Sequence, residues 1–94
     1  MLQIDRAGWR AWTDEEPIPL TRLEFRLLRA LAESHGRVLT HDFLLAHVWG
    51  FRENCEPLCT RRVPAAICSL RRKLGREGRL IRTLVGVGYW MEAD

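Results

Sequence analysis

The sequence predicts an α+β domain in which a short N-terminal antiparallel sheet precedes three helices and a C-terminal β-hairpin. Apolar and aromatic pieces alternate with turn residues over positions 1–20, which is typical of short strands. Apolar residues recur at helical spacing in three segments within positions 21–75, a three-helix core. Two strand-like pieces around a glycine-containing turn lie within positions 80–91. The chain has 94 residues, so we expect a single domain over positions 1–94.

Three short apolar pieces make up the N-terminal sheet that we expect. Polar or turn residues separate these pieces, which are Leu2–Ile4, Trp9–Trp12 and Ile18–Leu20. Alternation on this scale favours a small antiparallel meander.

The first helix begins at Thr21, where the sequence fits a capping box. The threonine hydroxyl is placed to accept from the backbone amide of Glu24, whose carboxylate can accept from the amide of Thr21. Leu20 and Phe25 occupy the two positions of a hydrophobic staple. Leucines follow at helical spacing, and we expect Gly36 to end the helix.

The second helix begins at Thr40 and ends at Gly50. Asp42 lies in its first turn, where the helix dipole favours an anion. Its apolar face comprises Leu44, Leu45 and Val48. Residues 51–59 contain asparagine, proline and two cysteines, and this composition predicts a loop.

The third helix is apolar on one side and small or cationic on the other. Thr60 is placed to cap it, and Gly75 follows its last residue. At about 100° per residue, one narrow stripe is apolar and must face the core: Val63, Ile67, Leu70 and Leu74. The opposite face comprises Arg62, Ala65, Ser69, Arg72 and Arg76, with Arg61 and Lys73 on its flanks.

Basic residues concentrate in the same part of the chain. Between Arg61 and Arg82 there are eight basic residues and one acidic residue, a net charge of +7, whereas the whole chain carries +3. Such asymmetry favours a polyanionic partner, with nucleic acid ahead of a membrane surface. A solvated arginine-rich face is the alternative reading of the same charges.

A helix pair, a basic-faced helix and a hairpin in this order form a winged helix-turn-helix layout. An α-helix fits the major groove of B-DNA, and small outer residues such as Ala65 and Ser69 let its backbone approach the bases. Arg62 and Arg72 lie on that outer face, so we expect at least one of them to contact base edges. Basic residues at the groove edges would neutralise phosphates, and we include Lys73 among these expected DNA contacts.

Four segments carry a resemblance to a known family that extends over essentially the whole chain, the N-terminal sheet included: LTRLEFRLLRAL (20–31), GRVLTHDFLLAHVWG (36–50), RRVPAAICSLRRKL (61–74) and IRTLVGVGYWM (81–91). Their order and spacing resemble the OmpR/PhoB-type winged-helix effector domain of two-component response regulators. The resemblance implies a sequence-specific double-stranded DNA-binding domain of a bacterial transcriptional regulator. Such regulators receive a phosphorelay signal through a receiver domain, for which 94 residues leave no room. The chain is therefore either an effector domain from a longer protein or a stand-alone winged helix.

The resemblance also implies roles for individual residues. The recognition helix would span residues 61–74 and lie in the major groove, and the wing, residues 80–91, would lie on the DNA backbone or in the minor groove. Val85 stands where some members insert an arginine into the minor groove. Phosphate contacts would come from Arg61 and Arg71 of the helix and from Thr83 and Tyr89 of the hairpin.

The partners that we expect follow from the same resemblance. Double-stranded DNA is the first. Loop 51–60 corresponds to the surface that can meet RNA polymerase in such activators. A second copy of the domain would bind on tandem or inverted half-sites.

Departures from the family pattern motivate an alternative function. Pro64 replaces a usual acidic residue, and Ala66 is smaller than the usual side chain. Cys68, Ser69 and Val85 stand where some members place basic residues. The alternative is a winged-helix protein-interaction module with weakened DNA contacts.

A second alternative is a thiol- or metal-responsive regulator that acts through Cys55 and Cys59. Together with Cys68 these cysteines have the spacing C-x3-C-x8-C, which lacks the paired C-x2-C of structural zinc sites. We therefore expect free thiols in a reducing compartment, and neither a metal nor another cofactor.

Enzymatic activity and membrane insertion are not expected. The sequence contains no recognisable catalytic triad order, phosphate loop or paired carboxylates in an apolar setting. No apolar run approaches the ~18 residues that span a bilayer, and Asp5 and Arg6 interrupt the N-terminus where a signal peptide is apolar. We expect a cytoplasmic protein without a membrane partner.

Overall fold

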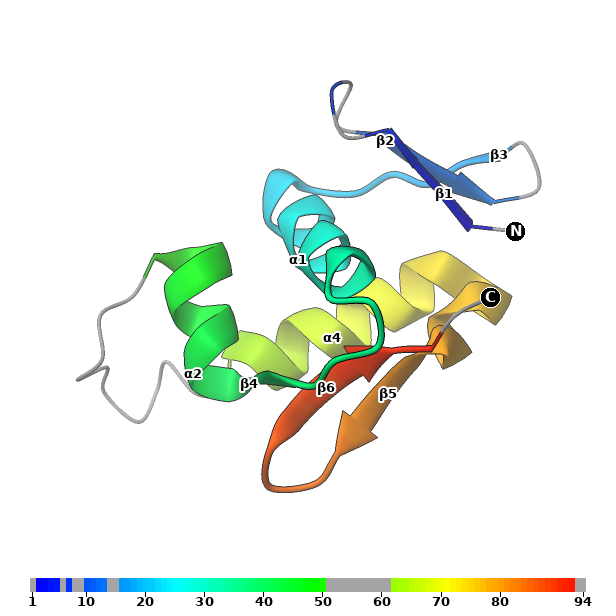
Figure 1. Cartoon of the computed structure of the whole chain (residues 1–94). Coiled ribbons are helices and arrows are strands. Elements are labelled where there is room, and N and C mark those ends of the chain that lie inside the picture. The colour runs from blue at the N-terminus through cyan, green and yellow to red at the C-terminus, as the bar shows by residue number, and fades with distance from the viewer. Residues whose placement is uncertain (1, 6, 8–9, 14–15, 51–61, 93–94) are drawn as a thin grey trace.

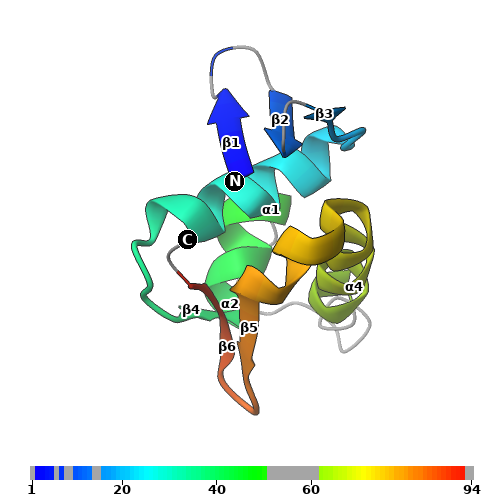
Figure 2. The same cartoon turned by 90° about the vertical axis from the view of Figure 1, so that its right-hand side faces the viewer.

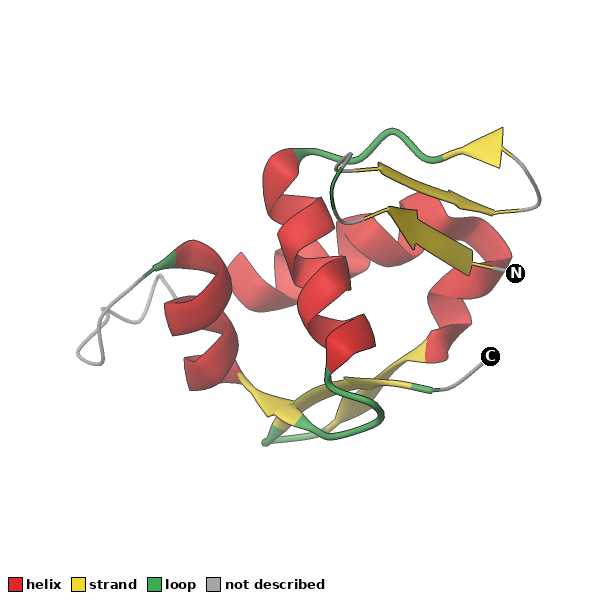
Figure 3. Cartoon of the chain, turned by 45° about the horizontal axis from the view of Figure 1, so that its top comes forward, coloured by secondary structure: helices red, strands yellow, loops and turns green. Residues whose placement is uncertain are grey.

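Two small antiparallel sheets lie on opposite sides of the helices in the computed structural model, which describes residues 2–5, 7, 10–13, 16–50 and 62–92. Figures 1 and 3 show the N-terminal sheet at one end of the molecule and the C-terminal sheet at the other, with the helices between them. The predicted α+β class and the order of its elements are confirmed.

The N-terminal sheet consists of β1 (Leu2–Asp5), β2 (Arg10–Thr13) and β3 (Glu16–Pro17), paired antiparallel in that order. This arrangement confirms the predicted meander, but its third strand precedes the expected Ile18–Leu20. Pairing nevertheless continues for one residue, because the Ile18 amide donates to the Ala11 carbonyl at 2.9 Å.

Helix α1 (Arg22–Glu33) begins with the predicted capping box. The Thr21 hydroxyl accepts from the Glu24 amide at 3.2 Å, and the Glu24 carboxylate accepts from the Thr21 amide at 2.9 Å. The helix ends before the expected Gly36, since positive φ angles of 53° and 84° follow its C-cap, Ser34. A left-handed pair of residues redirects the chain after a helix.

Helix α2 (His41–Leu44) continues as a π-helical segment, η1 (Leu45–Trp49). Thr40 caps α2 through its hydroxyl, which accepts from the amide three residues on at 3.1 Å. Gly50 ends the helical run in the left-handed conformation, with φ of 78°. Both boundaries are as predicted, but the π geometry is not, because apolar spacing over so few residues does not distinguish it from an α-helix.

Helix α4 (Arg62–Leu74) buries the predicted stripe: Val63, Ile67, Leu70 and Leu74. Residues 51–61 lie outside the described residues, so the predicted loop, its cysteines, Thr60 and Arg61 have no structural account. Gly75 follows α4 with φ of 62° and opens a 3₁₀ segment, η2 (Gly75–Leu80).

The C-terminal sheet has the order β4 (Leu39–Thr40), β6 (Gly88–Met91), β5 (Ile81–Leu84). The predicted hairpin is confirmed in β5 and β6, which pair antiparallel. Its first strand begins one residue later than expected, because Leu80 belongs to η2. Strand β4 lies directly before the second helix and pairs with β6, which no local pattern predicted.

The core lies where the helices meet the C-terminal sheet. The fully buried side chains include Leu27, Leu28 and Leu31 of α1, Leu44 and Val48, and Val63, Ile67 and Leu70 of α4. In the described part of the chain, no helix combines the length and the apolar character that crossing a bilayer requires.

Candidate nucleic-acid interface

Helix α4 and the β5–β6 hairpin provide the surface that the sequence predicts for nucleic acid. In Figure 2 the hairpin extends away from the helices beside α4, so its tip is the most protruding part of that end. The buried stripe of α4 faces the core, which leaves the opposite side of the helix to solvent.

The exposed face of α4 combines guanidinium groups with small side chains. Three predicted DNA-contact residues lie on it: Arg62, Ala65 and Arg72. Cys68 is exposed beside them as a free thiol, and Arg72 Nη2 lies 3.8 Å from its Sγ. Such a face can approach base edges closely while arginine donors match guanine O6 and N7.

Two other predicted contact residues of α4, Ser69 and Lys73, bond to α1. The Ser69 hydroxyl donates to Glu24 Oε2 at 2.7 Å. The Lys73 ammonium donates to Glu24 Oε1 at 2.6 Å and forms an ion pair with it. We call this cluster of Glu24, Ser69 and Lys73 the α1–α4 junction.

The carboxylate in the junction is charged despite its burial. Glu24 is 6% exposed. Burial alone would raise its pKa, but the hydrogen bonds from Lys73, Thr21 and Ser69 outweigh that effect and lower the pKa from 4.5 to about 2. Glu24 is therefore an anion at neutral pH, and it offsets the charge of Lys73.

Arg71 bonds to the hairpin on another side of α4. Its Nε and Nη2 donate to the Ile81 carbonyl at 3.1 and 2.7 Å. Nη2 also donates to the Thr83 hydroxyl at 2.8 Å. Two predicted phosphate-contact residues, Arg71 and Thr83, are thus brought together and tie the start of β5 to α4.

Tyr89, the fourth predicted phosphate-contact residue, lies inside the sheet. Its side chain is 5% exposed, it pairs with Thr83 across the hairpin, and its ring centroid is 5.3 Å from that of His41. Burial raises the pKa of its phenol, and the nearby charge of Arg71 opposes the rise. The ring therefore packs the hairpin against the start of α2.

The hairpin tip is apolar and solvent-exposed. Val85 is 88% exposed, and Leu84 and Val87 are nearly half exposed. The Val87 amide donates to the Leu84 carbonyl at 3.0 Å and closes the turn, in which Gly86 has φ of 78°. Val85 thus protrudes at the position where the sequence predicts the minor-groove contact.

Sequence reasoning did not count Cys68 among the DNA contacts, although it lies on the exposed face of α4, and it did not predict the bonds from the buried Glu24 to α4. Cys68 shares a face with Ala65 and Arg72 because it lies three residues after the first and four before the second, so helical spacing was the available signal. The capping pattern accounts fully for Glu24 within its own helix. Nothing local signals its second set of bonds, which reach α4.

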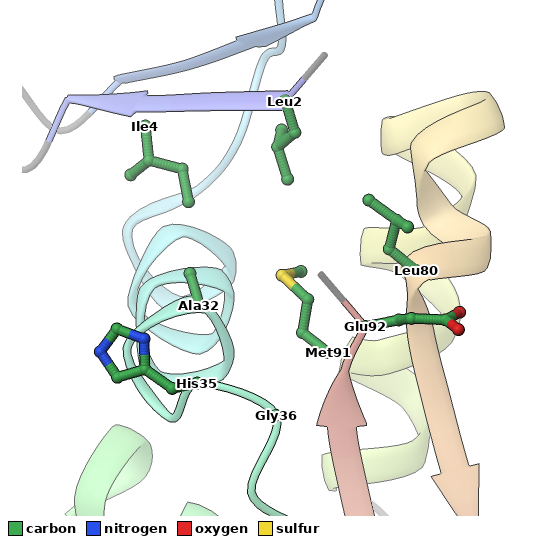
Figure 4. Close-up of a pocket in the computed structure, with 8 residues that line it drawn as sticks. All are labelled: Leu2, Ile4, Ala32, His35, Gly36, Leu80, Met91 and Glu92. Carbon is green, nitrogen blue, oxygen red and sulfur yellow. The ribbon is translucent and has the colours of Figure 1, made fainter. Parts of the chain in front are cut away.

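An apolar pocket of about 380 Å³ lies away from these residues, between β1, the end of α1 and the end of β6. Figure 4 shows Leu2 and Ile4 pointing from β1 toward Ala32 and Met91. None of the predicted DNA-contact residues lines it. Among the described residues, no group of three potential metal ligands comes together, and the predicted Cys55 and Cys59 lie outside them.

Comparison with known proteins identifies the relatives of this chain. A sequence profile of the family described as "Transcriptional regulatory protein, C terminal" matches residues 15–91. The chain is 49% identical over 92 residues to the transcriptional regulatory protein VxrB of Vibrio cholerae, and the match covers 98% of this chain and 36% of VxrB. The chain therefore spans little more than a third of that relative.

Solved structures share the fold. The DNA-binding domain of CpxR from E. coli matches with a TM-score of 0.85 and 33% identity, over 98% of this chain and 90% of that one. The DNA-binding domain of Klebsiella pneumoniae RstA, solved in complex with the RstA box, matches with a TM-score of 0.83 and 27% identity, over 97% and 90% of the two chains.

Proposed function

The chain belongs to the family of transcriptional regulatory protein C-terminal domains, the OmpR/PhoB-type effector domains, and on this premise we propose that it binds double-stranded DNA sequence-specifically as part of a bacterial response regulator. The observation that carries the proposal is the exposed face of α4, where Ala65 and Cys68 lie between Arg62 and Arg72. A similar domain, that of RstA, was solved in complex with its DNA box.

In the proposed complex, the recognition helix of residues 61–74 enters the major groove. Arg62 and Arg72 contact base edges, and Ala65 and Cys68 allow the close approach. The wing, residues 80–91, lies on the adjacent DNA backbone or in the minor groove, and Val85 at its tip is the residue nearest to the DNA. Phosphate contacts by Arg61, Arg71, Thr83 and Tyr89 stay predictions, and the internal bonds of Arg71 favour a role for it in holding the wing.

Selection from random duplex DNA followed by fluorescence anisotropy tests the proposal. We expect one preferred sequence, bound at least about 10³-fold tighter than random duplex at physiological salt. The logarithm of the affinity should fall linearly with the logarithm of the salt concentration, by about 0.9 for each phosphate neutralised. Affinity independent of salt, or no binding at low salt, contradicts the proposal.

The exposed apolar tip of the hairpin favours a second candidate, a winged helix that docks a protein. Leu84, Val85 and Val87 together offer an apolar contact without charge. This candidate predicts no preferred DNA sequence, so the same selection separates the two functions.

The remaining parts of the proposal concern the regulation, the location and the protein partners of this domain. We propose a receiver domain that controls this domain by phosphorelay, a cytoplasmic location, contact with RNA polymerase through residues 51–60, and pairing of two copies on adjacent half-sites. Sedimentation of the domain with DNA containing one or two copies of the selected site tests the pairing.

A further inference from the structure

We propose that Glu24 is a positioning residue for the recognition helix: through Ser69 and Lys73 it fixes the orientation in which α4 presents Arg62 and Arg72 to the DNA bases. This inference rests on the proposed DNA binding, and it reassigns Ser69 and Lys73 from DNA contacts to contacts between helices.

The geometry of the α1–α4 junction leaves its carboxylate little freedom. Oε1 accepts from the Thr21 amide at 2.9 Å and from Lys73 Nζ at 2.6 Å, and Oε2 accepts from Ser69 Oγ at 2.7 Å. The donors are the N-cap amide of α1 and side chains from two successive turns of α4. One side chain thus bridges both helices with both of its oxygens.

Because the carboxylate is buried, its hydrogen bonds favour one orientation of α4 over others. A buried carboxylate is costly unless hydrogen bonds and an opposite charge compensate it, and such bonds depend on direction more strongly than apolar contacts do. In the described part of the chain, every buried side-chain nitrogen or oxygen has a hydrogen-bond partner. Rotating α4 about its axis would therefore break the bonds that Ser69 and Lys73 donate to Glu24.

A second set of bonds holds α4 from the side of the hairpin. Arg71 donates to Ile81 and Thr83, whereas Ser69 and Lys73 bond to α1. On a helix, positions 69 and 73 lie on one flank, position 71 lies on the other, and Arg72 lies between them on the exposed face. The helix is therefore fixed at both edges of the surface that would enter the groove.

The charge of Lys73 supports the reassignment. Its ammonium is paired with Glu24 at 2.6 Å, and the side chain is 34% exposed. A contact with a DNA phosphate would have to compete with that bond. Arg76 offers a comparison, because it is an exposed cation beyond the end of α4 that takes no part in the junction.

The test compares the two cations on the selected site and on random duplex over a salt series. Lys73→Met should lower discrimination, the ratio of the two Kd values, by about tenfold or more and leave the salt slope unchanged. Lys73→Arg should restore most of the discrimination, because it can still donate to Glu24. Arg76→Met serves as the matched control, with discrimination unchanged and the slope reduced by no more than about 0.9.

Glu24→Gln gives an independent measurement, since the amide keeps the size of the side chain but loses the ion pair. We expect discrimination to fall as in Lys73→Met. Ser34→Ala, which removes a 2.6 Å hydrogen bond to Leu31 at the other end of α1, should keep the wild-type ratio. Equal discrimination in Glu24→Gln and wild type overturns the inference.

The outcomes distinguish a failure of the proposed DNA binding from a failure of the positioning role of Glu24. A wild-type domain with no preferred duplex overturns both the proposed function and this inference. If the wild type discriminates but Lys73→Met weakens both DNAs equally and reduces the slope by about 0.9, Lys73 is a phosphate contact and only the inference fails.

Discussion

Arg71 on α4 holds the carbonyl oxygen of Ile81 with two nitrogens of its guanidinium group, at 3.1 and 2.7 Å. Ile81 is the first residue of β5, so this bond joins the candidate recognition helix to the base of the wing. The third bond, to the Thr83 hydroxyl at 2.8 Å, extends the contact along the same strand. The wing therefore has a defined position relative to α4 before any DNA is present.

The first prediction concerns this link. Arg71→Met retains the length of the side chain but removes all three donated bonds, and we expect the free energy of unfolding to fall by about 1–2 kcal/mol. Urea denaturation measures it, with Arg79→Met as a control at an exposed arginine of η2. If the two variants unfold at the same urea concentration, Arg71 does not hold the wing.

The second prediction concerns Gly88, which lies directly against β4. A Cβ at this position would overlap the Leu39 carbonyl, a backbone atom that cannot move aside without breaking the β4–β6 pairing. Gly88→Ala should destabilise the domain by about 2 kcal/mol or more. Gly86→Ala should cost only about 1 kcal/mol. A φ of 78° is strained for alanine, but a Cβ at this position would meet no other atom. Thermal unfolding of the two variants should show the larger loss for Gly88→Ala.

The third prediction concerns acid stability. Folding lowers the pKa of Glu24 from 4.5 to about 2, so the carboxylate stabilises the fold fully at pH values above 4.5. That contribution should disappear as the pH falls from about 5 to about 2, a loss of about 2–3 kcal/mol. Other carboxylates contribute as well, so the measured quantity is the difference in unfolding free energy between wild type and Glu24→Gln. A pH-independent difference would contradict the lowered pKa.

Much of the fold was predictable because its signals are local. The capping box at Thr21, the glycine at the end of η1 and the apolar stripe of α4 each involve residues within a few positions of one another. The β4–β6 pairing was not, since Leu39 and Tyr89 are opposite each other only after the helices have packed.

The residues of the candidate site also fall into two groups, those that local spacing predicts and those that depend on contacts between helices. Helical spacing placed Arg62, Ala65 and Arg72 on the outer face of α4, and all three are exposed. It also placed Ser69 there, but the Ser69 hydroxyl bonds to Glu24. Ser69 lies near the edge of the outer face, where the neighbouring helix α1 determines which partner its side chain finds. Side-chain partners across helices have no sequence period.

The fourth prediction separates base contacts from phosphate contacts. Arg62→Ala or Arg72→Ala should cost about 1–3 kcal/mol on the preferred site and relax the preference at one base pair. Arg61→Ala should instead weaken binding to all sequences alike. Anisotropy on the preferred site and on its single-base variants measures both effects. Identical behaviour of the three variants would contradict these roles.

The last prediction concerns the hairpin tip. Val85 is 88% exposed and offers only apolar contact, so an arginine there would add a cation without disturbing the core. The narrow minor groove of A·T-rich DNA has an enhanced negative potential that attracts arginine. We therefore expect Val85→Arg to raise affinity for sites with A·T-rich flanks more than for the same sites with G·C-rich flanks.

Val85→Gln is the matched control, because it lengthens the side chain without adding charge. A gain on A·T-rich flanks that Val85→Gln lacks means that the wing lies in the minor groove. An equal gain on both kinds of flank means that the wing lies along the phosphate backbone, where charge acts without regard to groove width. No gain on either flank means that the tip does not approach DNA, and the apolar surface of Leu84, Val85 and Val87 then belongs to a contact with protein.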